Sequence, residues 1–276
     1  RLSAGRVKAY VREARRFLGE RGGQDLEILA LDEVTSYVVQ GCRRRRCQSA
    51  RDLVTGLRSL LRYLYLEGIT DCQLAPAVPT PAGWRGTWLP KGLTAEELAA
   101  LLGAFDASTA IGRRDYAIVV MLARLGLRAG EVTALTLDDL DWAQGEIVVH
   151  GNKANHTERL PLPVDVGEAL VGYLRDGRPK TTCRAVFVRA NGTEGLSAAG
   201  GVGRVVKRAV ARAGLASGSA HRLRHSAGTA MLRAGASLAE VGQVLRQRSS
   251  QVTAHYAKVD FVALRAVALP WPEGVA

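Results

Sequence analysis

The stretch His221-Arg222-Leu223-Arg224-His225 combines a histidine and an arginine three residues apart within a predicted helix over residues 221–234. Residues three apart on a helix share a face, so His221 and Arg224 are expected to point the same way. Upstream, Gly126-Leu127-Arg128-Ala129-Gly130-Glu131 repeats this spacing at a predicted helix start, where Glu131 can orient the Arg128 guanidinium. Arginines from two separate helices can grip one phosphate and neutralise charge as it develops at phosphorus.

Tyr256 closes a third stretch, residues 245–256, and a phenol can attack phosphorus and hold it covalently. A free tyrosine has a pKa near ~10, so a base must draw its proton away, and His221 can accept or relay that proton. Lys153, in a predicted turn, is the candidate general acid for the departing 5′ oxygen. Each residue alone has an ordinary alternative: a surface ion pair, an exposed turn lysine or a core tyrosine. The ordered set indicates DNA strand exchange rather than DNA binding alone.

The overall charge indicates a polyanionic partner. The chain has 276 residues, a formal net charge of +12 and 47% hydrophobic residues, which suits two folded domains with buried cores. Such a partner is nucleic acid or an acidic membrane surface, and no stretch approaches the ~20 apolar residues of a membrane span. The cysteines match no zinc-site spacing and are predicted to be reduced thiols of a cytoplasmic protein, with no metal or other cofactor expected: Cys42, Cys47, Cys72 and Cys183.

Residues 1–75 are predicted to form a helical N-terminal domain. Its clearest segment, residues 49–66, has an apolar stripe on one side and cations on the other. The stripe comprises Leu53, Leu57, Leu60 and Leu64, and the cations are Arg51, Arg58 and Arg62. Just before this helix stand Arg43, Arg44, Arg45 and Arg46, whose adjacent guanidinium groups repel one another unless an anion is near. Together the two features favour DNA phosphate contact over a merely solvated face, and Gly68 is the expected helix stop.

Residues 76–92 are rich in proline and glycine and are interpreted as a linker. A second domain is predicted for residues 93–276, and it opens with a capping box, Thr94-Ala95-Glu96-Glu97. A β-branched run at residues 146–150 and its return at 159–162 predict a β-hairpin or small sheet. Further helices are expected at residues 113–124, 129–137, 165–175, 197–213, 237–246 and 250–268. The expected fold class is therefore mainly α with a small β-sheet.

These stretches, together with Thr253-Ala254-His255-Tyr256-Ala257-Lys258-Val259-Asp260, resemble the tyrosine recombinase (phage integrase) family over essentially the whole chain. The resemblance implies a helical core-binding (SAM-like) domain at residues 1–75 and a mixed α/β catalytic domain of the DNA breaking-rejoining type at 93–276. It also implies the roles of the site residues. Arg128 and Arg224 would bind the scissile phosphate, Lys153 would protonate the leaving 5′ hydroxyl, His221 would assist proton transfer, and Tyr256 would form a 3′-phosphotyrosyl bond.

The implied reaction is site-specific recombination of double-stranded DNA without metal or ATP. Four protomers would bind core-type sites on two duplexes and pass through a Holliday junction. The apolar tail at residues 261–269 either docks on the neighbouring protomer, as is common in this family, or folds back on its own domain. The implied location is on DNA in the cytoplasm of a bacterial or phage-infected cell.

Two positions depart from the family pattern. Gln247 stands nine residues before Tyr256, where the family usually has His or Trp. Its amide can donate a hydrogen bond to a phosphate oxygen but cannot shuttle a proton. Lys153 is shifted by one residue relative to the family's Gly-Lys-Gly. Gln247 therefore leaves open a catalytically impaired DNA-binding homologue. A second alternative, which shares the tyrosine chemistry, is a monomeric enzyme that relaxes DNA as type IB topoisomerases do. No extra arm-type DNA-binding domain is expected unless it precedes Arg1.

Overall fold

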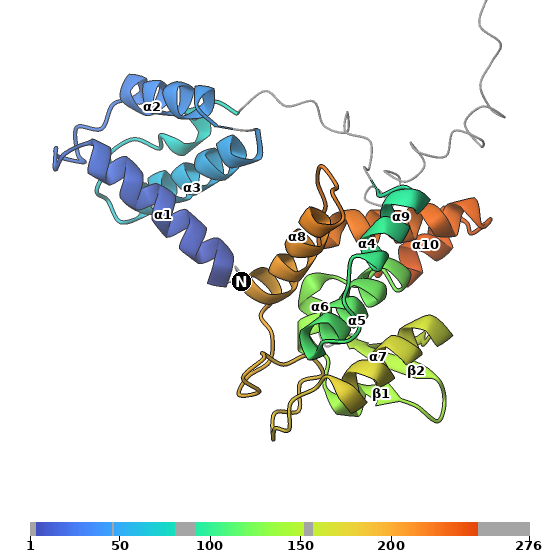
Figure 1. Cartoon of the computed structure of the whole chain (residues 1–276). Coiled ribbons are helices and arrows are strands. Elements are labelled where there is room, and N and C mark those ends of the chain that lie inside the picture. Colours follow the sequence, from blue (N-terminus) through green and yellow to red (C-terminus); the bar gives the residue numbers. More distant parts are fainter. Residues whose placement is uncertain (1–3, 46, 81–91, 152–156, 248–276) are drawn as a thin grey trace, which may run out of the picture. The chain divides into compact units, whose positions relative to one another are not determined.

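The computed structural model describes residues 4–45, 47–80, 92–151 and 157–247. The chain forms two compact units, Arg1–Thr87 and Trp88–Ala276, whose helices and strands are labelled in Figure 1. Each unit has its own hydrophobic core. The division falls inside the segment interpreted as a linker. Predictions for Arg46, Lys153, Tyr256 and the helix at 250–268 lie outside the described residues.

The first unit is a set of helices packed around α3. It contains α1 (Ala4–Glu20), α2 (Leu31–Arg43), α3 (Cys47–Leu66) and the short 3-10 turn η1 (Ala75–Ala77). Helix α3 contacts both α1 and α2, and its apolar face meets Phe17 and Val34 in the core. Residues Leu74, Ala75 and Val78 complete this core, so the packed chain continues past residue 75.

The predicted helix at 49–66 is confirmed, beginning two residues earlier at Cys47. All four predicted positions of its apolar stripe pack in the core, although Leu60 is only partly buried, and Leu61, at 1% exposure, joins them. The stripe is wider than a single row because α3 packs against two helices rather than one. Gly68 ends the helix as expected, with φ at +68° and the Ile69 amide donating to the Leu64 carbonyl at 2.9 Å.

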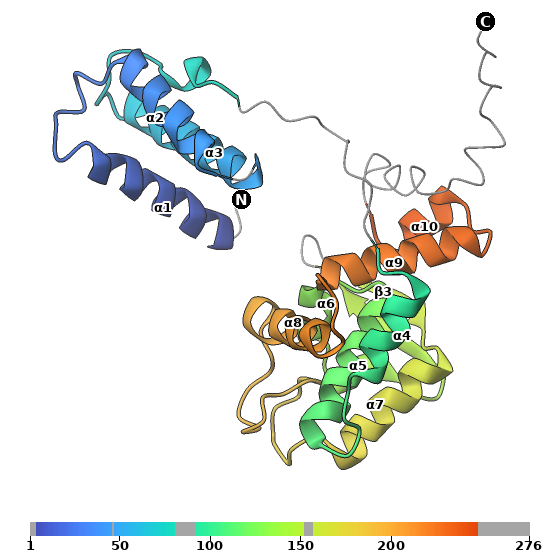
Figure 2. The same cartoon turned by 45° about the horizontal axis from the view of Figure 1, so that its top comes forward.

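The second unit is mainly helical around a small sheet, and Figure 2 shows the same elements from a second direction. Its elements in chain order are α4 (Ala95–Gly103), α5 (Ala110–Arg124), α6 (Ala129–Ala134), η2 (Leu137–Asp139), β1 (Leu140–Asp141), β2 (Glu146–His150), β3 (Thr157–Pro161), α7 (Val164–Asp176), the π-helical turn η3 (Ala198–Val202), α8 (Gly203–Arg212), α9 (Ala220–Arg233) and α10 (Leu238–Val244). The capping box at Thr94 and Glu97 is confirmed.

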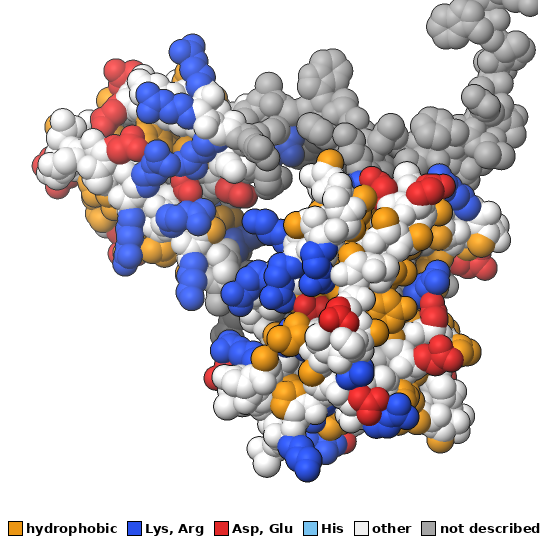
Figure 3. All heavy atoms as spheres, viewed as in Figure 1, with side chains coloured by type: hydrophobic (Ala, Val, Ile, Leu, Met, Phe, Trp, Pro, Cys, Tyr) orange, Lys and Arg blue, Asp and Glu red, His pale blue; other side chains and the backbone are white. Residues whose placement is uncertain are grey.

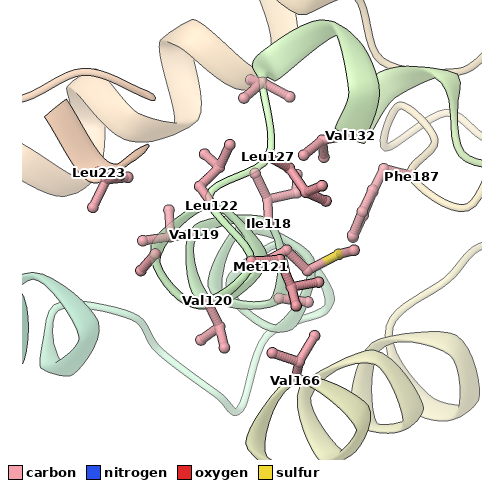
Figure 4. Packing of buried hydrophobic residues seen from close by; sticks show 14 of the residues in the cluster. Ile118, Val119, Val120, Met121, Leu122, Leu127, Val132, Val166, Phe187 and Leu223 are labelled. Atoms are coloured by element: carbon pink, nitrogen blue, oxygen red, sulfur yellow. The ribbon is translucent and has the colours of Figure 1, made fainter. Parts of the chain in front are cut away.

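Helix α5 is the centre of this unit. Every residue from Ala117 to Ala123 is buried, so the helix is covered on all sides rather than along one stripe. Figure 4 shows its side chains meeting Leu223 of α9, Val166 of α7 and Phe187. Because α6 and α9 both pack on this one helix, residues that are far apart in the chain are held in fixed positions around it.

The sheet is antiparallel in the order β1-β2-β3. The predicted hairpin is present as β2 and β3, with Ile147 opposite Leu160 and His150 opposite Thr157. Sequence patterns missed β1, which has only two residues and pairs with the start of β2. Alternation places Ile147 and Val149 in the core.

The part of the chain that the structure describes contains no helix long and apolar enough to cross a membrane. Cys42, Cys72 and Cys183 are free thiols. No group of three or more His, Cys, Asp or Glu side chains in that same part is placed to hold a metal ion.

Candidate active site

Arg128 and Glu131 form one structural unit at the start of α6. Arg128 is the residue before the helix, and its amide donates to Glu131 Oε2 at 2.8 Å while its Nη1 donates to Oε1 at 2.6 Å. Burial alone would raise the pKa of the Glu131 carboxyl, but the Arg128 amide and the charge of Arg246 outweigh burial and lower that pKa. Glu131 is therefore a buried carboxylate that fixes the Arg128 guanidinium, as its spacing predicted.

Arg224 extends from α9 towards the same place. Its side chain is buried, with Nη1 donating to the Gly126 carbonyl at 2.5 Å and Nη2 to the Leu245 carbonyl. Gly126 lies two residues before Arg128 and has φ at +57°. A Cβ at Gly126 would come within 2.4 Å of Leu245 Cδ2, so only glycine allows this approach.

The turn after α10 contacts both arginines. Arg128 Nη2 donates to the Arg246 carbonyl at 3.1 Å, next in the chain to the Leu245 carbonyl that accepts from Arg224. The Arg246 side chain forms an ion pair with Glu131 Oε2 at 3.0 Å. Gln247 is half-buried, and its backbone N–H donates to the Gly242 carbonyl at 2.9 Å. The turn that contacts both arginines therefore directly precedes, in the sequence, the segment that contains Tyr256.

His221 lies in the first turn of α9, a helix capped by the Ser219 hydroxyl. Desolvation lowers the pKa of the His221 imidazole, and the positive charges of Arg224 and Arg128 lower it further. His221 Nε2 and His225 Nε2 are 2.9 Å apart, with the rings edge to face. One ring must donate and the other accept, so His221 shares a proton with its neighbour one turn away.

The structure thus brings together five of the residues that the sequence singled out: Arg128, Glu131, His221, Arg224 and Gln247. They come from the start of α6, from α9 and from the turn after α10. Two cations fixed by buried acceptors, with a histidine of lowered pKa beside them, can bind a phosphate and accept a proton.

The comparisons with known proteins show the family of the chain. The model of the Phage integrase family matches residues 91–262. The putative integrase/recombinase y4rA of Sinorhizobium fredii is 42% identical over 98% of this chain and 67% of its own length. Tyrosine recombinase XerD of Mycobacterium tuberculosis is 31% identical over 96% of this chain and 91% of its own. The chain belongs to the phage integrase family. Its predicted class, a tyrosine-type site-specific DNA recombinase, is confirmed, and the alternatives are not favoured.

Solved structures of this phage integrase fold confirm the predicted fold class, mainly α with a small sheet. XerH recombinase bound to its difH substrate has a TM-score of 0.73 at 18% identity, covering 93% of this chain and 78% of that one. A lambda integrase dimer bound to a core site has a TM-score of 0.72 at 17% identity, covering 92% and 89%. The chain spans 67% and 61% of the length of two Sinorhizobium fredii relatives, y4rA and y4rF.

In this integrase-family chain, the arginines predicted to contact DNA fall into two groups. Arg43, Arg44 and Arg62 are exposed, and Arg51 is partly exposed. Arg45 and Arg58 are instead engaged within the first unit. The Arg45 Nη1 forms an ion pair with Glu13 at 2.8 Å, and Arg58 Nη2 donates to the Val78 carbonyl at 2.6 Å and to Thr80 Oγ1. The anion expected beside the arginine run is therefore, for Arg45, a carboxylate of the protein itself.

Sequence reasoning missed three features of the site. Gly126 was quoted in its motif without a structural reason, and His225 was quoted without a role, although its four-residue spacing from His221 is a usable signal. Arg246 gave no signal. A basic face on α8 was also missed, although its cations recur at helical spacing. Figure 3 shows Lys and Arg side chains gathered where α8 lies, and its exposed cations are Arg204, Lys207, Arg208 and Arg212.

Proposed function

We propose that this chain cuts and rejoins specific sites in double-stranded DNA through a covalent 3′-phosphotyrosyl intermediate. One observation carries the proposal: consecutive carbonyls of one turn, at Leu245 and Arg246, accept hydrogen bonds from Arg224 and Arg128. Two arginines from distant helices therefore share one small region, which leads directly into the segment that contains Tyr256. Relatives described as tyrosine recombinases, and similar folds solved on DNA, support this assignment.

The arginines would hold the scissile phosphate. Arg128 uses two of its N–H groups on the described residues Glu131 and Arg246, and its side chain is 46% exposed. A guanidinium has five N–H donors in all, so the exposed edge of Arg128 can bind phosphate oxygens. Both cations would stabilise the charge that accumulates as a fifth oxygen approaches phosphorus. Gln247 would donate its side-chain amide to a phosphate oxygen, where the family usually has a histidine or tryptophan.

Cleavage would exchange one phosphate ester for another. The Tyr256 oxygen forms a bond to phosphorus and its proton passes towards His221, whose neutral imidazole can accept it. The bond from phosphorus to the 5′ oxygen breaks, and Lys153 gives that oxygen a proton. A 5′ hydroxyl from the partner duplex then attacks phosphorus and releases the tyrosine by the reverse steps. Because the phosphotyrosyl ester conserves the free energy of the broken phosphodiester bond, the cycle consumes neither ATP nor a metal-bound water.

The two units would share the DNA. We assign residues 1–75, with their packed continuation to Val78, as the core-binding domain, the rest of residues 76–92 as the linker and 93–276 as the catalytic domain. The exposed cations of the first unit, Arg43, Arg44, Arg51 and Arg62, and those of α8 would contact phosphates, consistent with the net charge of +12. A lambda integrase has been solved as a tetramer on a Holliday junction. We propose the same four-protomer assembly here, with residues 261–269 as the candidate contact between neighbours, acting on cytoplasmic DNA.

The test uses a nicked suicide duplex, from which the released fragment diffuses away and leaves the enzyme attached. Its sequence comes from mapping the DNA that the protein occupies in cells carrying the gene. The wild type is expected to form an adduct, and Tyr256→Phe is expected to form none while binding the duplex normally. Tyr65→Phe, at a tyrosine 41% exposed in the first unit, is the matched control. A wild type that forms no adduct on DNA it binds would overturn the proposal.

A further inference from the structure

Arg246 adopts a backbone conformation that arginine normally avoids. Its φ is +52°, and it is the single non-glycine residue with positive φ among the described residues. It also ends α10: the Arg246 amide donates to the Gln243 carbonyl at 2.8 Å and the Gln247 amide donates to the Gly242 carbonyl at 2.9 Å. This paired pattern is the Schellman end of a helix, where glycine is the usual residue because it lacks a Cβ. Helix termination alone therefore does not explain an arginine here.

The Arg246 side chain is also costly to hold in place. It is only 7% exposed, and its Nε–H is buried without a hydrogen-bond partner in the described part of the chain. Unusual backbone conformations and unpaired buried donors lower stability, and such features collect at functional sites. A charged residue that is unfavourable in both respects calls for a functional reason.

The contacts of Arg246 supply that reason. Its Nη2 bonds Glu131 Oε2 at 3.0 Å, while Arg128 bonds the other oxygen of the same carboxylate. Its own carbonyl accepts from Arg128 Nη2 at 3.1 Å. Side chain and backbone of Arg246 thus hold both sides of the Arg128–Glu131 pair. The preceding carbonyl, at Leu245, holds Arg224. The consecutive residues Leu245 and Arg246 therefore link Arg224 and Arg128 to the chain that continues to Tyr256.

We propose that Arg246 is a positioning residue. It keeps the arginines that bind the phosphate, Arg128 and Arg224, in register with the segment that carries the nucleophile, Tyr256. Its guanidinium holds Glu131, and through it Arg128, at the distance fixed by the turn. Its left-handed backbone directs successive carbonyls to the two arginines. This inference rests on the proposed function, because register matters only if a phosphate is attacked from that segment.

The test separates the guanidinium from the backbone. Arg246→Ala removes the guanidinium and keeps the unfavourable φ, whereas Arg246→Gly removes the guanidinium and relieves that φ. Arg246→Lys keeps a cation that can reach Glu131. Arg233→Ala removes an exposed cation at the end of α9 and serves as the matched control. For each variant, thermal melting is measured together with the first-order rate of adduct formation on the nicked suicide duplex, with DNA saturating.

We expect Arg246→Gly and Arg246→Ala to lose cleavage rate equally, by roughly ten- to a hundredfold, because small misplacements of reacting groups have effects of this size. Their melting temperatures should differ, with glycine higher, and Arg246→Lys should recover most of the rate. A merely structural role predicts that the rates follow the melting temperatures, with glycine the faster. That result, or Arg246→Gly cleaving at the wild-type rate, would overturn the inference while leaving the proposed function intact. A wild type without an adduct would instead overturn the proposed function.

Discussion

At the scale of single residues, His221 shows how environment selects chemistry. An isolated imidazole is half protonated near pH ~6.5, but in this site desolvation, and after it the positive charges of Arg224 and Arg128, lower the pKa of His221 and favour its neutral form. A neutral imidazole at physiological pH can accept a proton from a phenol, whereas an imidazolium cannot. The two arginines proposed to bind phosphate therefore add to the effect of burial in keeping His221 neutral, the form that the proposed base requires.

This lowered pKa is directly measurable. In an NMR titration of the DNA-free protein, with the signal assigned by its loss in His221→Gln, the His221 midpoint should lie below about 6.5. The unfolded chain takes up this proton at higher pH than the folded one. The free energy of unfolding should therefore fall as the pH drops from the unfolded pKa towards the folded one, and this slope should be absent in His221→Gln. A midpoint at or above that of a free histidine would contradict the assignment.

Gln247 gives a second prediction for a single residue. A histidine at this position could donate to a phosphate oxygen and also carry a proton, so Gln247→His should raise the rate of adduct formation, by roughly tenfold or less. The side chain follows the α10 turn and is half-buried, so the change should leave melting nearly unaltered. A variant as inert as the parent, in a protein that binds its site, would support the impaired-homologue alternative.

At the scale of elements, apolar periodicity predicted most helices, because one buried stripe leaves a clear pattern in the sequence. Helix α3 is the clearest case among the helices, and the β2–β3 hairpin was predicted from its run of β-branched residues. What sequence could not predict depends on distant partners. Arg58 looks like a DNA-facing cation, but its acceptor is the Val78 carbonyl 20 residues away. Arg246 looks like any arginine, because its partners Glu131 and Arg128 lie more than 100 residues earlier in the chain.

The close approach of Gly126 to the α10 turn is an element-level contact that can be tested by stability. Gly126→Ala would place a methyl group against Leu245 Cδ2 in a left-handed backbone position. It should destabilise the second unit by roughly 1–3 kcal/mol and lower its melting temperature by several degrees. Gly172→Ala, within α7 with nothing near its added Cβ, is the control and should be neutral or slightly stabilising. Equal melting of the two variants would show that the 126–245 contact is not tight.

At the scale of the whole molecule, charge determines how DNA is held. Lys207 on α8 is exposed, and Lys207→Gln should weaken duplex binding and reduce the slope of log affinity against log salt by about 1, the value for one lost phosphate contact. Lys180→Gln, also at an exposed lysine of the second unit, should leave the slope unchanged. If both variants have the wild-type slope, α8 does not contact phosphate.

The sequence could predict which residues make up the candidate site but not the hydrogen bonds that join them. The ordered motifs indicated which arginines and which histidine would meet, because their spacing on helices is local. The bonds that join them are not local: Arg224 reaches Gly126 across 98 residues, and Arg128 reaches the Arg246 carbonyl across 118. No periodic pattern in the sequence indicates such pairings, so the contacts of Arg246 and of the backbone acceptors are visible only in the folded structure.

These long spans have a consequence for protein synthesis. The contacts that orient Arg128 include an acceptor 118 positions later in the chain, and Arg224 is tied to a carbonyl made 98 positions before it. A ribosome that has not yet synthesised α10 and the turn after it has therefore produced a polypeptide in which Arg128 lacks its Arg246 acceptor. Premature termination upstream of α10 would release a fragment that lacks the Leu245 and Arg246 carbonyls, and with them one acceptor of each arginine.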